Sequence, residues 1–116
     1  MQIIKEQIEG LIALYSTCNP FDLCKFLNIK LMEHDLGEKI KGCFHITPDG
    51  YRIIYINSKL SEAERTDRCA HELGHALLHT NNTINIFNET DMQVIEHCEK
   101  EADLFASELL KLYYSS

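Results

Sequence analysis

The chain has 116 residues, a hydrophobic fraction of 45%, a charged fraction of 25% and a formal net charge of −7. This composition is typical of a globular protein, and we expect one domain over residues 1–116. The 11 basic residues form no run, which argues against a direct nucleic-acid partner. No apolar segment approaches the roughly 20 residues that cross a bilayer, and the N-terminal residues lack the apolar core of a signal peptide. We therefore expect a cytoplasmic protein with no membrane partner.

The first part of the chain is expected to form two helices and a strand. Apolar residues recur on one helical face over residues 2–15. Asn19-Pro20 is typical of a helix N-terminus, with Asn as the cap and Pro at the first helical position, and this second helix ends near residue 28. Weak alternation over residues 29–33 then predicts a strand.

Two further strands are expected over residues 42–47 and 51–57, which are rich in β-branched and aromatic residues. Pro48-Asp49-Gly50 joins them, and these residue types supply a fixed φ, a local side-chain cap and a positive φ. The two runs therefore predict an antiparallel hairpin, and with residues 29–33 a short antiparallel three-stranded sheet.

A helix with metal-binding character is expected from Ser61 to about residue 80. Ser61 and Glu64 have the spacing of a capping box. Most apolar residues of this helix lie opposite the face that carries His71 and His75. Gly74 costs about 1 kcal/mol in a helix, and the close approach of another backbone would explain why it is there.

The remaining segments are a loop and a last helix. Asn81-Asn82-Thr83 is expected to end the preceding helix, and a loop leads to Asp91. From Met92 onward, apolar residues at three- and four-residue steps predict a long amphipathic helix.

Five cysteines at irregular spacing include no C-x-x-C pair, which argues against a disulfide framework or a cysteine-type zinc site. All five are beside apolar neighbours, and we expect them to be free and buried.

The sequence His71-Glu72-Leu73-Gly74-His75 is an H-E-x-x-H motif. Residues i and i+4 lie on one face of a helix, so both imidazoles can bind one ion. Glu72 is rotated by about 100° from this pair, which makes it a candidate general base for a metal-activated water.

A catalytic zinc usually has a third protein ligand. His79 is too far along the helix, about 12 Å from His71, and is expected to be an outer hydrogen-bond partner or a helix-end residue. The last helix offers Glu99 and Glu101 on opposite margins of its apolar face, and periodicity does not choose between them. Asp103 is expected to be solvated, and His97 could orient Glu101 or a substrate.

Two segments of this chain resemble the ImmA/IrrE metallo-endopeptidases. They are residues 70–79 (A-H-E-L-G-H-A-L-L-H) and 101–110 (E-A-D-L-F-A-S-E-L-L), and residues 51–57 and 19–22 are also similar. The resemblance implies an α+β, zincin-like domain whose H-E-x-x-H helix packs against the last helix. It also implies one zinc ion held by His71, His75 and Glu101.

The resemblance further implies site-specific cleavage of a helix-turn-helix repressor, encoded by a phage or an integrative element. Glu72 would take a proton from the attacking water and pass it to the leaving amine. The hairpin is expected to bind an extended peptide along a strand edge. The second donor to the developing oxyanion stays open among several residues: His45, Tyr51, Arg52, Tyr55 and His97.

Two alternatives belong to other classes. The protein could be a non-catalytic antirepressor that sequesters a transcription factor. Its acidic net charge would suit a basic DNA-binding partner. It could also be a zinc hydrolase that acts on a small molecule. Glu72 favours an enzyme, because a structural metal site has no use for a base beside it.

Overall fold

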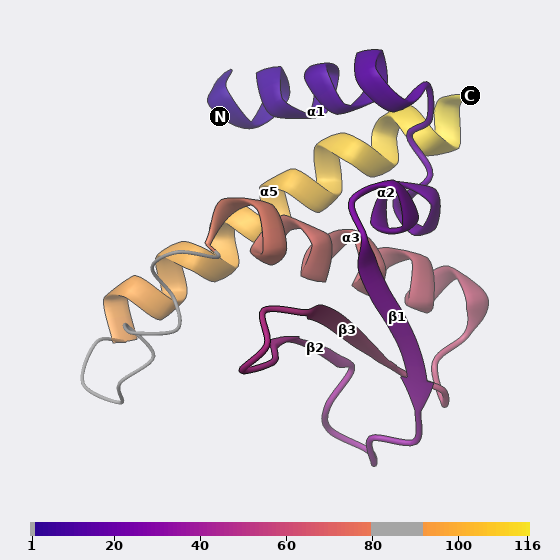
Figure 1. Cartoon of the computed structure of the whole chain (residues 1–116), viewed down its shortest axis with the longest axis vertical. Helices are drawn as coiled ribbons and strands as arrows, with labels where there is room; N and C mark the ends of the chain where they lie inside the picture. The colour runs from indigo at the N-terminus through magenta and orange to yellow at the C-terminus, as the bar shows by residue number, and fades with distance from the viewer. Residues whose placement is uncertain (1, 80–91) are drawn as a thin grey trace.

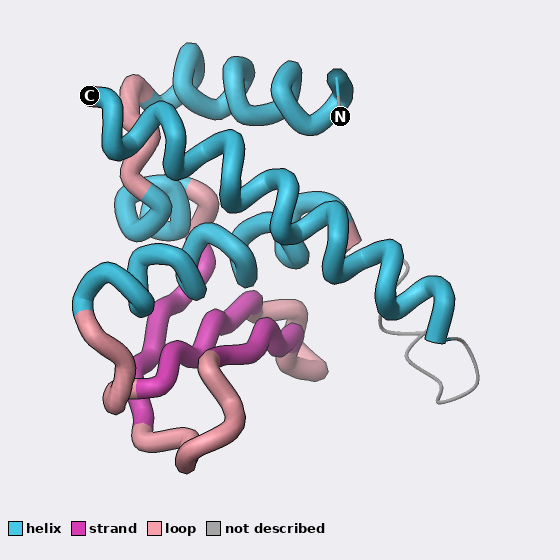
Figure 2. The backbone as a smooth tube through the Cα atoms, turned by 180° about the vertical axis from the view of Figure 1, so that it is seen from behind, coloured by secondary structure: helices cyan, strands magenta, loops and turns pink. Residues whose placement is uncertain are grey.

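The computed structural model describes residues 2–79 and 92–116, and this part of the chain is α+β, with four helices and a three-stranded sheet. In chain order the elements are α1 (Gln2–Tyr15), α2 (Pro20–Phe26), β1 (Ile29–His34), β2 (Gly42–Ile46), β3 (Arg52–Asn57), α3 (Glu62–Leu78) and α5 (Met92–Ser115). The sheet packs under α3, α5 crosses the other side of α3, and α1 packs on α5 (Figure 1). Seen from behind, the strands lie together beneath α3 (Figure 2).

The sheet is mixed, so the prediction of an antiparallel sheet was wrong for one strand. β2 and β3 form the expected antiparallel hairpin, but β1 pairs in parallel with β3, and the strand order is β1-β3-β2. β3 fits the central position because Ile54 and Ile56 are buried. The connection from β1 to β2 is held by buried Asn57, whose Nδ2 donates at 2.8 Å to the carbonyl oxygens of Gly37 and Ile40. This connection carries the chain past β3, so that β2 becomes an outer strand.

The local signals at the element ends are confirmed. The Asn19 side chain accepts from the N–H of Phe21 at 2.9 Å, with Pro20 as the first helical residue. The capping box of α3 is complete, because Ser61 Oγ accepts from the Glu64 N–H at 3.2 Å and the Glu64 carboxylate accepts from the Ser61 N–H at 3.0 Å. These interactions satisfy backbone donors that a helix N-terminus would otherwise leave unpaired.

The core lies between α3 and its neighbours on both sides. Buried side chains come from the sheet, from α3 and from α5, and they include Ile54, Leu73 and Phe105. His71, which contacts α5, and Glu72, which lies on the side of β2, are also buried, with exposed fractions of 6% and 4%. The histidine face of α3 is therefore an internal surface between two helices.

Gly74 allows α3 and α5 to approach closely, as the sequence suggested. A Cβ atom at this position would lie 3.1 Å from the Phe105 Cβ and 3.2 Å from the Ala102 Cα. Contacts this short require the neighbouring helix to move. The glycine thus sets the distance between the two helices that carry the histidines and carboxylates.

The five cysteines are free thiols, as predicted. Cys24, Cys69 and Cys98 are buried, and the Sγ atoms of the first two lie 3.8 Å apart. Cys43 is exposed, contrary to the prediction, because it alternates on β2 with Phe44, which packs against the core.

α3 ends at Leu78, close to the predicted position, and the N–H of its cap residue His79 donates to the His75 carbonyl at 3.0 Å. The predicted helix end at residues 81–83 and the loop to Asp91 lie outside the described residues. Within residues 2–79 and 92–116, every helix is too short or too polar to span a bilayer.

Candidate metal centre

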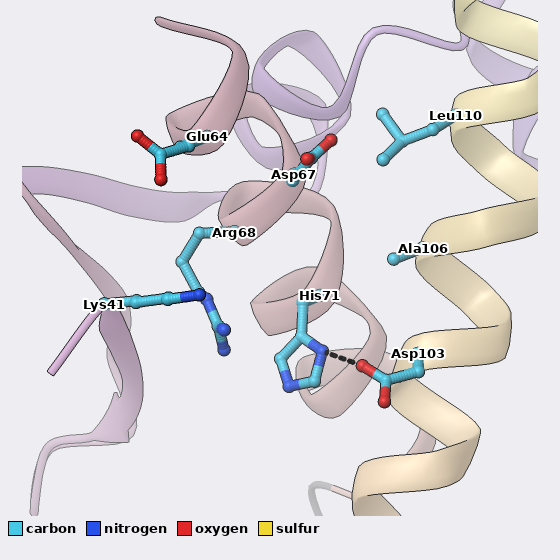
Figure 3. A pocket seen from close by; sticks show the side chains of 8 residues that line it. All are labelled: Lys41, Glu64, Asp67, Arg68, His71, Asp103, Ala106 and Leu110. Carbon is cyan, nitrogen blue, oxygen red and sulfur yellow. Dashed lines mark ion pairs between the residues drawn. The ribbon is translucent and has the colours of Figure 1, made fainter. Parts of the chain in front are cut away.

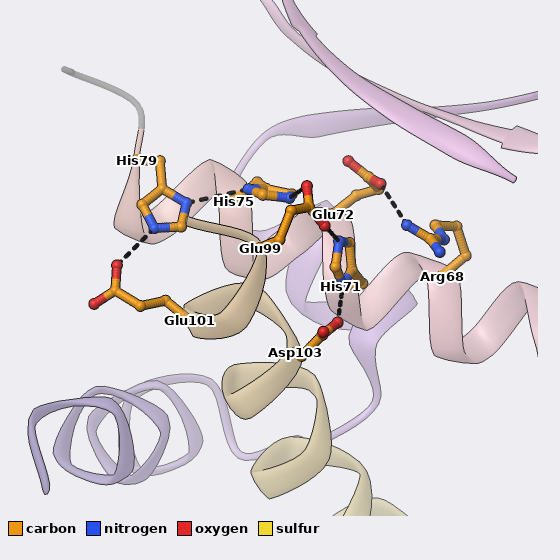
Figure 4. Close-up of polar contacts among 8 residues, drawn as sticks. All are labelled: Arg68, His71, Glu72, His75, His79, Glu99, Glu101 and Asp103. Atoms are coloured by element: carbon orange, nitrogen blue, oxygen red, sulfur yellow. Dashed lines mark hydrogen bonds and ion pairs between the residues drawn. The ribbon is translucent and has the colours of Figure 1, made fainter. Parts of the chain in front are cut away.

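Two imidazoles of α3 and one carboxylate of α5 meet between these helices (Figure 4). Glu99 Oε1 lies 2.9 Å from His75 Nε2, and Glu99 Oε2 lies 3.0 Å from His71 Nε2. The ring centroids of the two histidines are 4.8 Å apart. One ligand atom from each of the three residues lies within 4.8 Å of the other two, which is a spacing that one metal ion can bridge. The two histidines are therefore brought together as the H-E-x-x-H spacing predicted.

The donor set fits a divalent cation such as zinc. His71 Nε2 is buried and has no hydrogen-bond partner in the described part of the chain. The Glu99 oxygen at 3.0 Å does not satisfy it, because hydrogen bonding also requires alignment. Burial lowers the pKa of His75 below its ordinary value, which favours the neutral imidazole that binds metals. Two imidazole nitrogens and a carboxylate oxygen are ligands that zinc accepts.

Asp103 orients His71. Its Oδ1 lies 2.8 Å from His71 Nδ1. A carboxylate this close favours a proton on His71 Nδ1, which would leave the lone pair of Nε2 on the side of Glu99. Asp103 is exposed to solvent as expected, with 71% of its side chain accessible, but it also contacts His71. Its position one helical turn after Glu99 was the signal that could have found it.

Glu72 is a buried carboxylate held by a guanidinium. Its Oε2 accepts from Arg68 Nη1 at 3.2 Å, one turn earlier on α3. Burial raises the pKa of Glu72 above its ordinary value, and His71 and Arg68 oppose this effect. A carboxylate with a raised pKa beside the candidate metal ligands is suited to accept a proton.

Glu101 does not join the histidine pair in this structure. Its Oε1 lies 2.9 Å from His79 Nε2, and its Oε2 lies 3.6 Å from His97 Nε2. Residues two positions apart on a helix differ in direction by about 200°, so the side chains of Glu99 and Glu101 leave α5 on nearly opposite sides. The carboxylate that lies at the histidine pair is that of Glu99, the alternative that periodicity had left open.

A cavity of about 240 Å³ opens beside Glu72, His75 and Glu99. Its opposite wall is formed by Gly42, Cys43 and Phe44 of the outer strand β2, and Arg68 of α3 completes the lining. A strand at the edge of the sheet, as far as the chain is described, therefore lies across the cavity from the candidate metal ligands.

The residues considered as oxyanion donors are not among those that line this cavity. Tyr51 and Arg52 line a separate cavity, and the Arg52 guanidinium donates to the Leu27 carbonyl. Tyr55 packs its ring against His34 at a centroid distance of 5.9 Å. His45 and His97 are exposed. Arg68, which the sequence did not single out, is the cation that lines the cavity with Glu72.

A second cavity of about 330 Å³ lies on the other side of Arg68 (Figure 3). His71 and Asp103 form one end, and Ala106 and Leu110 of α5 form an apolar wall. The polar wall combines two cations with two acids: Lys41, Arg68, Glu64 and Asp67. The two cavities share Arg68, so they flank the candidate metal ligands on adjacent sides.

The chain is similar to proteins of a known peptidase family. Residues 24–110 match the family model described as the IrrE N-terminal-like domain, a peptidase family. Over 108 residues the chain is 39% identical to immunity region protein 2 of Bacillus phage phi105, covering 93% of the chain and 68% of that protein. It is also 32% identical over 108 residues to the metallopeptidase ImmA of Bacillus subtilis strain 168, covering 92% of the chain and 62% of that protein. The chain thus spans about two thirds of the length of these relatives.

Proposed function

The chain belongs to the peptidase family of the IrrE N-terminal-like domain, and we propose that it is a zinc-dependent endopeptidase that cleaves a helix-turn-helix repressor of a phage or mobile element. One observation carries the chemistry. His71, His75 and Glu99 converge between α3 and α5, and the buried carboxylate of Glu72 lies beside them with its own cation. This is the set of groups that metal-assisted hydrolysis requires.

The residues divide the work of hydrolysis between them. His71, His75 and Glu99 would hold the ion, and a zinc ion supplies a Lewis acid that polarises a carbonyl and makes water more acidic. Glu72 accepts a proton from the water as the oxygen attacks the scissile carbonyl carbon. It then delivers this proton to the amide nitrogen as the C–N bond breaks. Arg68 holds one oxygen of Glu72, which leaves the other for the water.

The substrate is expected to bind as an extended strand along β2. This strand pairs with β3 on one side only in the described part of the chain, and Gly42, Cys43 and Phe44 line the cavity beside Glu72. An added peptide strand would gain main-chain hydrogen bonds and would lie across the candidate metal ligands. The net charge of −7 suits a basic DNA-binding substrate. The phage relative is named as an immunity region protein, and the proposal takes a repressor of such a region as the substrate.

The test uses Glu72→Gln, which keeps the size of the side chain and removes the base. The zinc-loaded protein is incubated with the helix-turn-helix repressor encoded beside its gene, and fragments are followed by mass spectrometry. We expect cleavage at one peptide bond by the wild type, and a rate lower by about 10²- to 10⁴-fold for the variant.

The matched control is Glu62→Gln, an exposed glutamate in the first turn of the same helix. It should cleave at the wild-type rate. Cleavage by Glu72→Gln at the wild-type rate would overturn the mechanism. A stable complex with an intact repressor would instead show a non-catalytic antirepressor.

A further inference from the structure

His79 and Glu101 form a pair directly behind the candidate ligand His75. His79 caps the C-terminus of α3, Glu101 comes from α5, and Glu101 Oε1 lies 2.9 Å from His79 Nε2 (Figure 4). The other nitrogen of His79, Nδ1, lies 3.1 Å from His75 Nδ1. His79 is only 5% exposed and therefore has little access to water. The pair connects a carboxylate of one helix, through an imidazole, to the ring nitrogen of His75 that faces away from Glu99.

The direction of these hydrogen bonds follows from the carboxylate. Glu101 can only accept, so His79 Nε2 must carry a proton. A neutral imidazole then has a lone pair on its other nitrogen, and His79 Nδ1 becomes an acceptor. Since His75 Nδ1 is the atom that faces it, a proton on that nitrogen completes the chain of hydrogen bonds that starts at Glu101. Glu99 Oε1 lies 2.9 Å from His75 Nε2 and competes for the same proton. A metal ion held by Glu99 would remove this competition, and His75 Nε2 would then offer its lone pair to the ion while Nδ1 keeps the proton.

We infer that Glu101 and His79 form a positioning relay that holds His75 in the Nδ1–H tautomer, and so keeps its Nε2 ready for the metal. This inference rests on the metal site of the proposed function. It gives His75 the counterpart of the contact that Asp103 makes with His71. One histidine is fixed by a carboxylate directly, and the other by a carboxylate that acts through a second imidazole.

The relay also assigns different tasks to three acidic residues of α5. Glu99 contacts the Nε2 atoms of His71 and His75. Glu101 contacts the ring of His79, and Asp103 contacts Nδ1 of His71. Glu101 is therefore a positioning residue in this account and not a ligand.

A double-mutant cycle on zinc affinity tests the relay, measured by competition with a chromogenic chelator. Glu101→Ala and His79→Phe should each weaken zinc binding by about 10- to 100-fold, the usual cost of losing such an outer partner. Because Glu101 acts only through His79, the double variant should bind zinc no more weakly than His79→Phe alone. Asp103→Ala provides the matched control, because it acts through His71 and its effect should multiply with that of Glu101→Ala.

A second readout reports the tautomer directly and does not depend on bound metal. In the Glu99→Ala background, which removes the competing carboxylate, two-bond ¹H–¹⁵N spectra at pH 8.5 should show His75 protonated on Nδ1. Adding Glu101→Ala should shift His75 toward the Nε2–H form and leave His71 unchanged. Thermal unfolding shows that each variant is folded.

Several outcomes would overturn the relay while leaving the proposed function intact. They are an unchanged zinc affinity in Glu101→Ala, a His75 tautomer that does not respond to Glu101, or losses in the double variant that multiply. If the wild type itself does not bind zinc, the proposed function fails as well.

Discussion

Each of the two candidate ligand histidines has its second ring nitrogen in contact with another side chain. His71 Nδ1 faces Asp103, and His75 Nδ1 faces His79. Both Nε2 atoms consequently lie on the Glu99 side. Outer contacts of this kind raise the basicity of a ligand and restrict the rotation of its ring. The site is thus pre-organised by side chains that would not touch the metal.

At the same scale, Cys43 predicts a chemical test of the cleft. Its exposed thiol lines the cavity that contains Glu72, His75 and Glu99. The walls of the cavity partly bury the sulfur, and this partial burial, followed by the Glu72 carboxylate, raises the pKa of Cys43 above its ordinary value. The reactive thiolate is therefore scarcer at pH 7 than for a free cysteine, and labelling should accelerate as the pH rises.

We expect N-ethylmaleimide to modify Cys43 and to abolish repressor cleavage in parallel, because the adduct fills the space beside β2. The mass of the labelled peptide and the residual activity are measured on the same samples. Cys43→Ser, compared with its own untreated activity, should resist the reagent. Complete labelling of Cys43 without loss of activity would show that substrate does not enter by this cavity.

At the scale of elements, the close contact of α3 with α5 depends on Gly74. Gly74→Ala would place a methyl group 3.1 to 3.2 Å from atoms of Ala102 and Phe105. We expect the free energy of unfolding to fall by about 1–3 kcal/mol, the usual cost of overpacking. Zinc affinity should also fall, because moving α5 displaces Glu99 from the histidines.

Gly10→Ala is the matched control for this prediction. Gly10 is an exposed residue of α1, and a methyl group added there would meet no neighbouring side chain or element within 4 Å. In a helix this change should raise the free energy of unfolding by up to about 1 kcal/mol. Urea unfolding of both variants and of the wild type measures these changes in the free energy of unfolding. If Gly74→Ala is as stable as Gly10→Ala and binds zinc normally, the helices do not depend on this contact.

The element boundaries were largely predictable because their causes are local. Asn19-Pro20, the Ser61 to Glu64 capping box and the turn at Gly50 act within a few residues of themselves. The pairing of β1 was not predictable in the same way. Its parallel alignment with β3 depends on the path of the connection that Asn57 fixes, and that path is a tertiary feature.

At the scale of the whole molecule, the candidate site lies where three layers meet. The sheet supplies the edge of β2, α3 supplies the histidines and Glu72, and α5 supplies the carboxylates (Figure 1). α1 packs on α5 from the outside. A metal bound to ligands from both α3 and α5 would join these layers, and it would stabilise the folded chain because the unfolded chain lacks the site.

This arrangement also explains which part of the site the sequence could predict. His71, Glu72 and His75 follow from the geometry of one helix, so their spacing was sufficient. The choice between Glu99 and Glu101 depends on the rotation of α5 against α3, which involves residues far apart in the chain. Arg68 and Asp103 were missed because charged residues on a helix are usually solvated, and only the packed structure shows their partners.

The zinc content of two single variants tests the central claim most directly. Wild type, Glu99→Ala and Glu101→Ala are loaded with zinc and dialysed against a weak chelator, and zinc per chain is measured by atomic emission. We predict one zinc per chain in the wild type, retention with weaker affinity in Glu101→Ala, and loss in Glu99→Ala. Loss of zinc from Glu101→Ala together with full retention by Glu99→Ala would contradict the metal centre described above.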